Sequence, residues 1–126
     1  MPKYMYICAY SPGSWARMIR ISDDRTEAAK TLVEALGGTL ECVFWEVSTQ
    51  AAYAVADMPD SSTAAAATAV LNHTGAFKNV ESHQLLTQDQ MSGILRLASD
   101  VSDVYRVPGQ AVLEGDSPES RLEYRA

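Results

Sequence analysis

The chain has 126 residues, of which 47% are hydrophobic and 21% are charged, as is usual for a single globular domain with an adequate core. Its formal net charge is −6 and its lysines and arginines are scattered, which argues against a nucleic-acid binder because neutralising phosphates requires a basic surface. We find neither a transmembrane run of about 18 apolar residues nor the apolar segment of a signal peptide, and we therefore expect a cytoplasmic protein.

The first predicted element is a strand over residues 3–11. Its residues alternate between two faces: one carries Tyr4, Tyr6, Cys8 and Tyr10, and the other carries Met5, Ile7 and Ala9. Apolar character on both faces predicts a central strand that is buried on both sides. Pro12-Gly13 is expected to break the chain, and residues 14–21 have the pattern of a short helical turn.

The first long helix is expected to begin between residues 22 and 26, with Ser22 or Asp23 as its N-cap. Apolar residues recur along it at intervals of three and four, and Gly37-Gly38 supplies its end. Residues 39–47 and 51–58 follow as two strands, which meet at the corner Ser48-Thr49-Gln50.

An alanine-rich helix comes next, with Ser61 or Ser62 as its expected cap and Gly75 as its stop. Residues 78–86 are predicted to form a fourth strand. Thr87 and Gln90 have the spacing of a capping box for a last helix, whose apolar stripe is Met91, Ile94, Leu95, Ala98 and Val101. We assign residues 1–110 to one domain that includes this helix, and residues 111–126 to a polar tail.

The order β-α-β-β-α-β, followed by a helix, predicts an α+β ferredoxin-like fold with an antiparallel sheet. Right-handed crossovers place the first and third strands in its centre and the second and fourth at its edges. Cys8 and Cys42 then lie on strands that do not touch, so we expect free thiols and no disulfide. The two crossover helices cover only one face of the sheet, and the other face needs a partner, which a second copy of the chain would provide.

Several polar and aromatic residues are expected at one end of this sheet, where the first strand ends and the fourth begins. They are Tyr10, Trp15, Glu46, Gln50, His73 and Lys78. A pocket with convergent polar groups between sheet and helices is the usual form of a small-molecule site. We find no metal-ligand spacing, glycine-rich phosphate loop or nucleophile elbow, and we expect no metal and no cofactor.

Each candidate residue has a structural alternative to its functional interpretation. His73 is a candidate general base or a helix-terminal residue that complements the dipole, and His83 points either into a cavity or into a dimer interface. Tyr10, Trp45 and Tyr53 either line a ligand pocket or pack on a strand face. Glu46 is a buried carboxylate with a raised pKa or a solvated one. The ligand-binding candidates are Tyr10, Trp15, Trp45, Glu46, Gln50 and Tyr53, with Trp15 as a lid.

Several short motifs resemble the GYD domain family: the opening M-P-K-Y, A-L-G-G, M-P-D before an alanine-rich helix, T-G-A-F-K-N-V and L-L-T. The later Y-R-V-P-G is similar to a Y-R-P-P-G pattern that often follows this domain, so the resemblance covers residues 1–110. It implies a dimeric α/β barrel, from a wider group that includes isomerases, cofactor-free oxygenases and haem-handling enzymes. The family's Gly, Tyr and Asp are replaced here by Ser48-Thr49-Gln50-Ala51, so no catalytic Asp is carried over.

Two functions follow as hypotheses. The first is a small homodimeric protein that binds an apolar or aromatic small molecule, and acts as a cofactor-free isomerase, cyclase or monooxygenase if His73 or His83 moves protons. The second is a non-catalytic oligomerisation or ligand-sensing module. The absence of a strong catalytic motif favours the second, and the aromatic residues favour the first.

Overall fold

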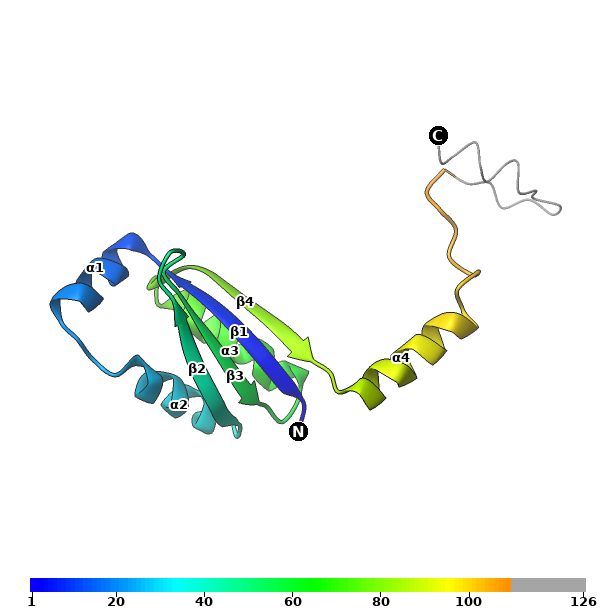
Figure 1. Ribbon diagram of the computed structural model, residues 1–126, viewed down its shortest axis with the longest axis horizontal. Helices are drawn as coiled ribbons and strands as arrows, with labels where there is room; N and C mark the ends of the chain where they lie inside the picture. Colours follow the sequence, from blue (N-terminus) through cyan, green and yellow to red (C-terminus); the bar gives the residue numbers. More distant parts are fainter. Residues whose placement is uncertain (110–126) are drawn as a thin grey trace. The chain divides into compact units, whose positions relative to one another are not determined.

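The computed structural model describes residues 1–109, so the predicted polar tail of residues 111–126 lies outside the described residues. The elements follow the chain in the order β1 (Lys3–Tyr10), α1 (Pro12–Arg20), α2 (Arg25–Ala35), β2 (Thr39–Glu46), β3 (Ala51–Asp57), α3 (Ser61–His73), β4 (Phe77–Leu85) and α4 (Gln88–Asp100) (Figure 1). The chain divides between Leu86 and Thr87 into two units, and this boundary falls inside the predicted domain of residues 1–110.

The first unit contains one antiparallel sheet with the strand order β2-β3-β1-β4. The predicted α+β ferredoxin-like fold is confirmed, with β1 and β3 in the centre. Cys8 on β1 and Cys42 on β2 are free, as expected for two strands that β3 separates. The connection from β1 to β2 carries α1 and α2, and the connection from β3 to β4 carries α3.

The helices α2 and α3 cover one face of this sheet, as Figure 1 shows for α3 behind the strands; α2 packs on β2 and α3 on β4. The tyrosine column of β1 points to this face, because Tyr4, Tyr6, Cys8 and Tyr10 are buried and alternate with half-buried residues. Strand register sets Ala56, Ala54 and Ala52 of β3 beside Tyr4, Tyr6 and Cys8. The core of the unit therefore pairs a column of large side chains with a column of small ones.

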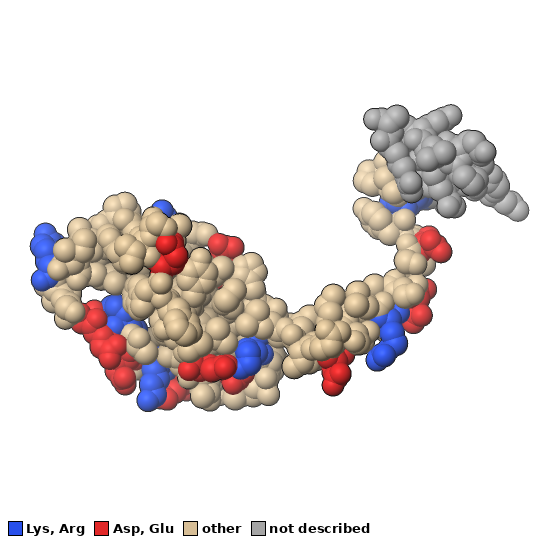
Figure 2. All heavy atoms as spheres, in the orientation of Figure 1, with Lys and Arg blue, Asp and Glu red and all other residues tan. Residues whose placement is uncertain are grey.

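The opposite face of the sheet, which we call the open face, carries no helix of the first unit. Apolar side chains that are half-buried or exposed point to it from the central strands β1 and β3 and from the edge strand β2: Met5, Ile7, Tyr53, Val55, Cys42 and Phe44. Phe44 is 69% exposed. Figure 2, in the same orientation, shows mainly uncharged atoms over the middle of this face and charged side chains along its rim. The prediction that β1 is buried on both sides is therefore fulfilled on only one side within the described unit.

Helix starts account for most differences from the sequence predictions. Asp24 caps α2 through Thr26 N–H and Glu27 N–H, in place of Ser22 or Asp23, and Asp60 caps α3 in a capping box with Thr63, in place of Ser61 or Ser62. Helix α1 begins at Pro12 instead of being broken by it. Proline is favoured in the first turn, where its missing N–H costs no hydrogen bond, and Ser11 caps the helix.

The second unit contains α4, whose capping box of Thr87 and Gln90 confirms the prediction for its start. Its apolar residues Met91, Ile94, Leu95 and Val101 are between 39% and 57% exposed, so no described residue buries this stripe. No helix in residues 1–109 is long and apolar enough to cross a membrane.

Gly38, between α2 and β2, lets the chain pass close to the end of β3. A Cβ atom at this position would lie 2.5 Å from the carbonyl oxygen of Asp57 and 2.7 Å from the sulfur of Met58, a side chain with no exposed surface. We expect Gly38→Ala to lower the free energy of unfolding by about 2 kcal/mol or more, as overpacking does, in urea denaturation.

Gly13→Ala is the matched control for this substitution. Its Cβ atom would meet only Arg17 Nη1 at 3.7 Å, an ordinary contact. We expect it to change the free energy of unfolding by less than ~0.5 kcal/mol. Equal stabilities of the two variants would contradict the close packing at Gly38.

Candidate functional site

A cavity of about 130 Å³ lies between the helix-covered face of the sheet and the helices α2 and α3. It exists because small side chains face one another there: Ala52, Ala54 and Ala56 on β3, Ala28 and Ala29 on α2, and Ala67 on α3. Larger side chains close it on the remaining sides, among them Leu32, Val43 and Leu71. The cavity is thus apolar over most of its wall, as small-molecule pockets usually are.

Aromatic rings gather at the end of the cavity where β1 finishes. Tyr10 stacks on Trp45, with ring centroids 5.8 Å apart and planes 18° from parallel, and it also contacts Phe77 at 4.6 Å. Trp15 of α1 lies with Trp45 along a second hollow, which Arg25 also lines. These rings give a planar ligand surfaces on which to stack.

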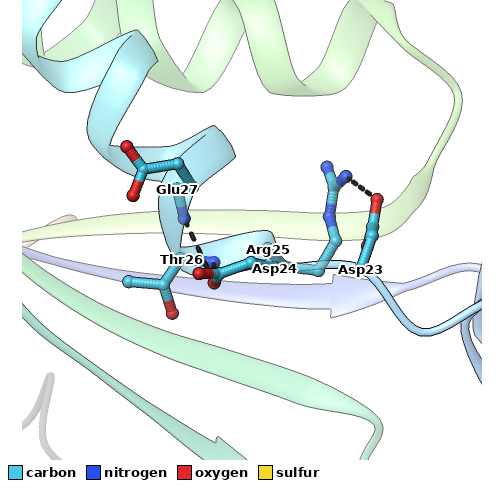
Figure 3. A network of polar contacts seen from close by, with 5 residues as sticks. All are labelled: Asp23, Asp24, Arg25, Thr26 and Glu27. Atoms are coloured by element: carbon cyan, nitrogen blue, oxygen red, sulfur yellow. Dashed lines mark hydrogen bonds and ion pairs between the residues drawn. The ribbon is translucent and has the colours of Figure 1, made fainter.

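Arg25 stands at the entrance, at the first position of α2. Its side chain lines the cavity and the hollow beside Trp15. It also lines a third hollow, which Ser14, Arg17 and Ala76 line as well. Nη1 donates to Asp23 Oδ2 at 3.1 Å, whereas Nε is buried and has no hydrogen-bond partner among the described residues. Figure 3 shows the Asp24 carboxylate turned into the first turn of α2, while the Arg25 side chain runs the other way beside Asp23.

The titratable groups that line the cavity are all held in their protonated forms. Burial raises the pKa of Cys8 to about 11, and burial also raises the pKa values of Tyr6 and Tyr10. Desolvation is the largest single influence on Arg25 and lowers its pKa, but Tyr10 and Asp23, through side-chain hydrogen bonds and charge, together raise the pKa above its usual value. Near neutral pH these groups are hydrogen-bond donors, so the lining offers donors to a ligand and no carboxylate or imidazole base.

The predicted gathering at this end of the sheet is partly observed. Of that group, Tyr10 lines the cavity and Trp15 lines the adjoining hollow; Trp45, a separate ligand-binding candidate, lines both. Gln50 takes part through its backbone, because its carbonyl oxygen accepts a hydrogen bond of 3.0 Å from Tyr10 N–H. His73 ends α3 as an exposed residue, with Nδ1 3.3 Å from the carbonyl oxygen of Val70, and it does not line the cavity.

Two further candidates lie on the open face. Tyr53 is paired with Ile7 and Phe44, and His83 is paired with Met5. Nε2 of His83 lies 3.2 Å from Oε1 of Glu81, and both side chains are about half exposed. The sheet separates these residues from the cavity, so neither adds a group to its lining.

Glu46 holds the corner between β2 and β3 in place. Its carboxylate accepts hydrogen bonds from Ser48 N–H at 2.9 Å and Thr49 N–H at 2.8 Å, and from both hydroxyls. These bonds, from the hydroxyls first, lower the pKa of Glu46 to about 2. The interpretation of Glu46 as a buried acid with a raised pKa is therefore wrong, because hydrogen bonds to the charged form dominate over burial. Gln50 completes the turn with φ 57°.

Sequence reasoning missed Arg25, Cys8, Phe77 and the facing alanines. One signal for Arg25 was present: a cation at the start of a helix opposes the helix dipole, so a residue of this kind there suggests another role. No group of three or more potential metal ligands is found within residues 1–109.

The GYD domain family model matches residues 4–95, which is more than half of the chain and includes every residue that lines the cavity. The chain therefore belongs to the GYD domain family. Neither a curated protein nor a solved structure gives a match.

The carboxylate of Glu46 makes the hairpin sensitive to acid. A group whose folded pKa is depressed contributes stability above its unfolded pKa, near 4.5, and this stability is lost as the pH falls through about 2. We expect Glu46→Gln to lower Tm at neutral pH and to flatten the dependence of Tm on pH between these values. Thermal unfolding of both proteins across this range tests it, with Glu34→Gln on the exposed side of α2 as control; parallel curves for wild type and Glu46→Gln would contradict it.

Proposed function

We propose that this GYD domain binds one small apolar or aromatic molecule in the cavity between the sheet and the helices α2 and α3. The observation that carries this proposal is the hollow core itself. Close packing is the rule in protein interiors, and voids larger than a water molecule are few. A cavity of about 130 Å³ between six alanines costs stability that larger side chains would restore, and a ligand offsets that cost.

The arrangement of polar groups supports binding at one end of the cavity. The Tyr6 hydroxyl is already occupied, because it donates to the carbonyl oxygen of Ala64 at 2.8 Å. Tyr10 and Arg25 stand at the entrance, beside Trp45. An apolar body with a few polar groups at one side is the pattern that fixes the orientation of a bound small molecule.

The lining favours binding over a cofactor-free isomerase, cyclase or monooxygenase reaction. Proton transfer from a substrate requires a base within hydrogen-bond reach. Cys8, Tyr6 and Tyr10 have raised pKa values, and His73 and His83 are not lining residues. A role as a ligand carrier or ligand sensor follows from these features.

We further propose that the protein is a homodimer joined through its open face. The apolar centre of this face, with Phe44 as its most exposed member, matches the hydrophobic patch and polar rim of a protein–protein interface. The dimeric α/β barrel of sheet packed on sheet is the arrangement that covers it. The two free thiols, Cys8 and Cys42, fit a reducing compartment, and we propose the cytoplasm.

Filling the cavity tests the binding proposal. Ala54 lies on β3 between Tyr6 and Val43, so Ala54→Leu places three more carbon atoms in the hollow. We expect wild-type protein to retain a small molecule in native mass spectrometry or to bind added toluene in ligand-observed NMR. Ala54→Leu should weaken toluene binding at least about tenfold, since 1.4 kcal/mol of lost contact suffices for that change, and should leave Tm equal or higher.

Ala65→Leu is the control for this experiment, because Ala65 is exposed on the same helix that supplies Ala67. It should bind toluene as the wild type does. Equal toluene affinities for Ala54→Leu and Ala65→Leu would refute the cavity as the binding site.

A charge on the open face tests the dimer. We expect wild-type protein to have twice the chain mass in size-exclusion chromatography with light scattering. Phe44→Asp should raise the dimer Kd by about 100-fold or more, as loss of a central aromatic contact does. Val70→Asp, on the exposed side of α3, should remain dimeric. A monomeric wild type, or a dimer unaffected by Phe44→Asp, would refute this interface.

A further inference from the structure

We infer that the molecule bound in the cavity carries an anionic group, and that Arg25 binds this group at the entrance; the ligand class that fits is a small aromatic carboxylate with one ring. This inference rests on the proposed function, because it names the ligand class of the same cavity.

The size of the cavity limits its occupant to about one ring. An engineered apolar cavity of about 150 Å³ holds benzene, and the cavity here has a similar volume of about 130 Å³. Tyr10 and Trp45 are stacked at the same end. A flat ring therefore fits between the alanines with one edge directed to the entrance.

Arg25 has a donor that the described residues do not use. Its Nε atom is buried and lacks a partner, while Asp23 contacts Nη1 and the Tyr10 side chain also interacts with the guanidinium. A buried donor without an acceptor costs free energy, and an arginine donor costs more than a neutral one. A carboxylate is the acceptor that best fits the planar fork of a guanidinium, because two parallel hydrogen bonds then form.

The position of Arg25 adds a second argument. The first residue of a helix lies at the positive end of the dipole, where a cation is unfavourable and an anion favourable. Asp24 already caps α2, so Arg25 contributes nothing to the cap. A bound anion that pairs with the guanidinium would offset the unfavourable charge at this point of the chain.

Asp23 allows the anionic ligand to be tested by two substitutions with opposite expected effects on its affinity. Its carboxylate pairs with Arg25 and lines the hollows on both sides of it, so it competes with an anionic ligand. Removing the arginine charge should weaken binding of an anion, and removing the aspartate charge should strengthen it. A purely structural ion pair predicts the same direction for both substitutions, because either one breaks the pair.

The test compares benzoate with benzamide, which have the same shape but differ in charge, and with toluene, which tests the cavity alone. Affinities are measured at neutral pH by ligand-observed NMR. We expect wild type to favour benzoate over benzamide at least about tenfold. Arg25→Met should lower benzoate affinity by roughly 10- to 100-fold and benzamide affinity much less. Asp23→Asn should raise benzoate affinity about twofold or more.

Arg20→Met is the control, because Arg20 is exposed on α1 and lines neither the cavity nor the two hollows beside it. It should leave all three affinities unchanged. If Arg25→Met does not fold, Asp23→Asn and Arg25→Lys, which keeps the charge but removes the fork, decide the question by their benzoate affinities.

The two proposals fail in different ways. Toluene binding with no preference for benzoate would overturn the anionic ligand and leave the cavity proposal standing. A benzoate affinity that falls in Asp23→Asn would also overturn it. If none of the three compounds binds, both the cavity proposal and the ligand class are refuted.

Discussion

The pairing of β1 with β3 is the constraint on which the rest of this molecule depends. Its register places the tyrosine column of β1 beside the alanine column of β3 on one face of the sheet. Large side chains on one strand hold the helices away from the sheet, and small side chains on the next strand do not fill the space that remains. A shift of β3 by one residue would turn its alanine column to the other face of the sheet, away from the tyrosine column, and would remove the cavity.

At the start of α2, the residue that caps the helix stands next to the residue that lies at the cavity entrance. Asp24 accepts hydrogen bonds from two of the free N–H groups of the helix, those of Thr26 and Glu27, so the residue after it has no capping role. That position holds Arg25, whose positive charge the helix dipole disfavours. The ion pair with Asp23 offsets this unfavourable charge only in part. Departures from local preference are expected where a chain serves a function, and this one lies at the entrance of the cavity.

Local patterns in the sequence were sufficient for the fold. The two-residue alternation of β1, the pair Gly37-Gly38 and the capping box of Thr87 each predicted an element that the structure contains. The cavity was beyond such patterns, because it arises from alanines of three different elements that meet only after folding. Cys8 was missed as a lining residue for the same reason, whereas topology alone placed Tyr10 and Trp15 at one end of the sheet.

The corner between β2 and β3 shows how a polar turn supports the cavity without adding chemistry to it. The carboxylate of Glu46 closes the turn by accepting hydrogen bonds from Ser48 and Thr49. Hydrogen bonds occupy that carboxylate and hold its pKa near 2, so it is unsuited to accept a proton near neutral pH. The backbone of the same corner still positions Tyr10, through the bond from its N–H to Gln50. The corner therefore supports the wall of the cavity without contributing chemistry to it, and recognition falls to the residues on the helix side of the sheet.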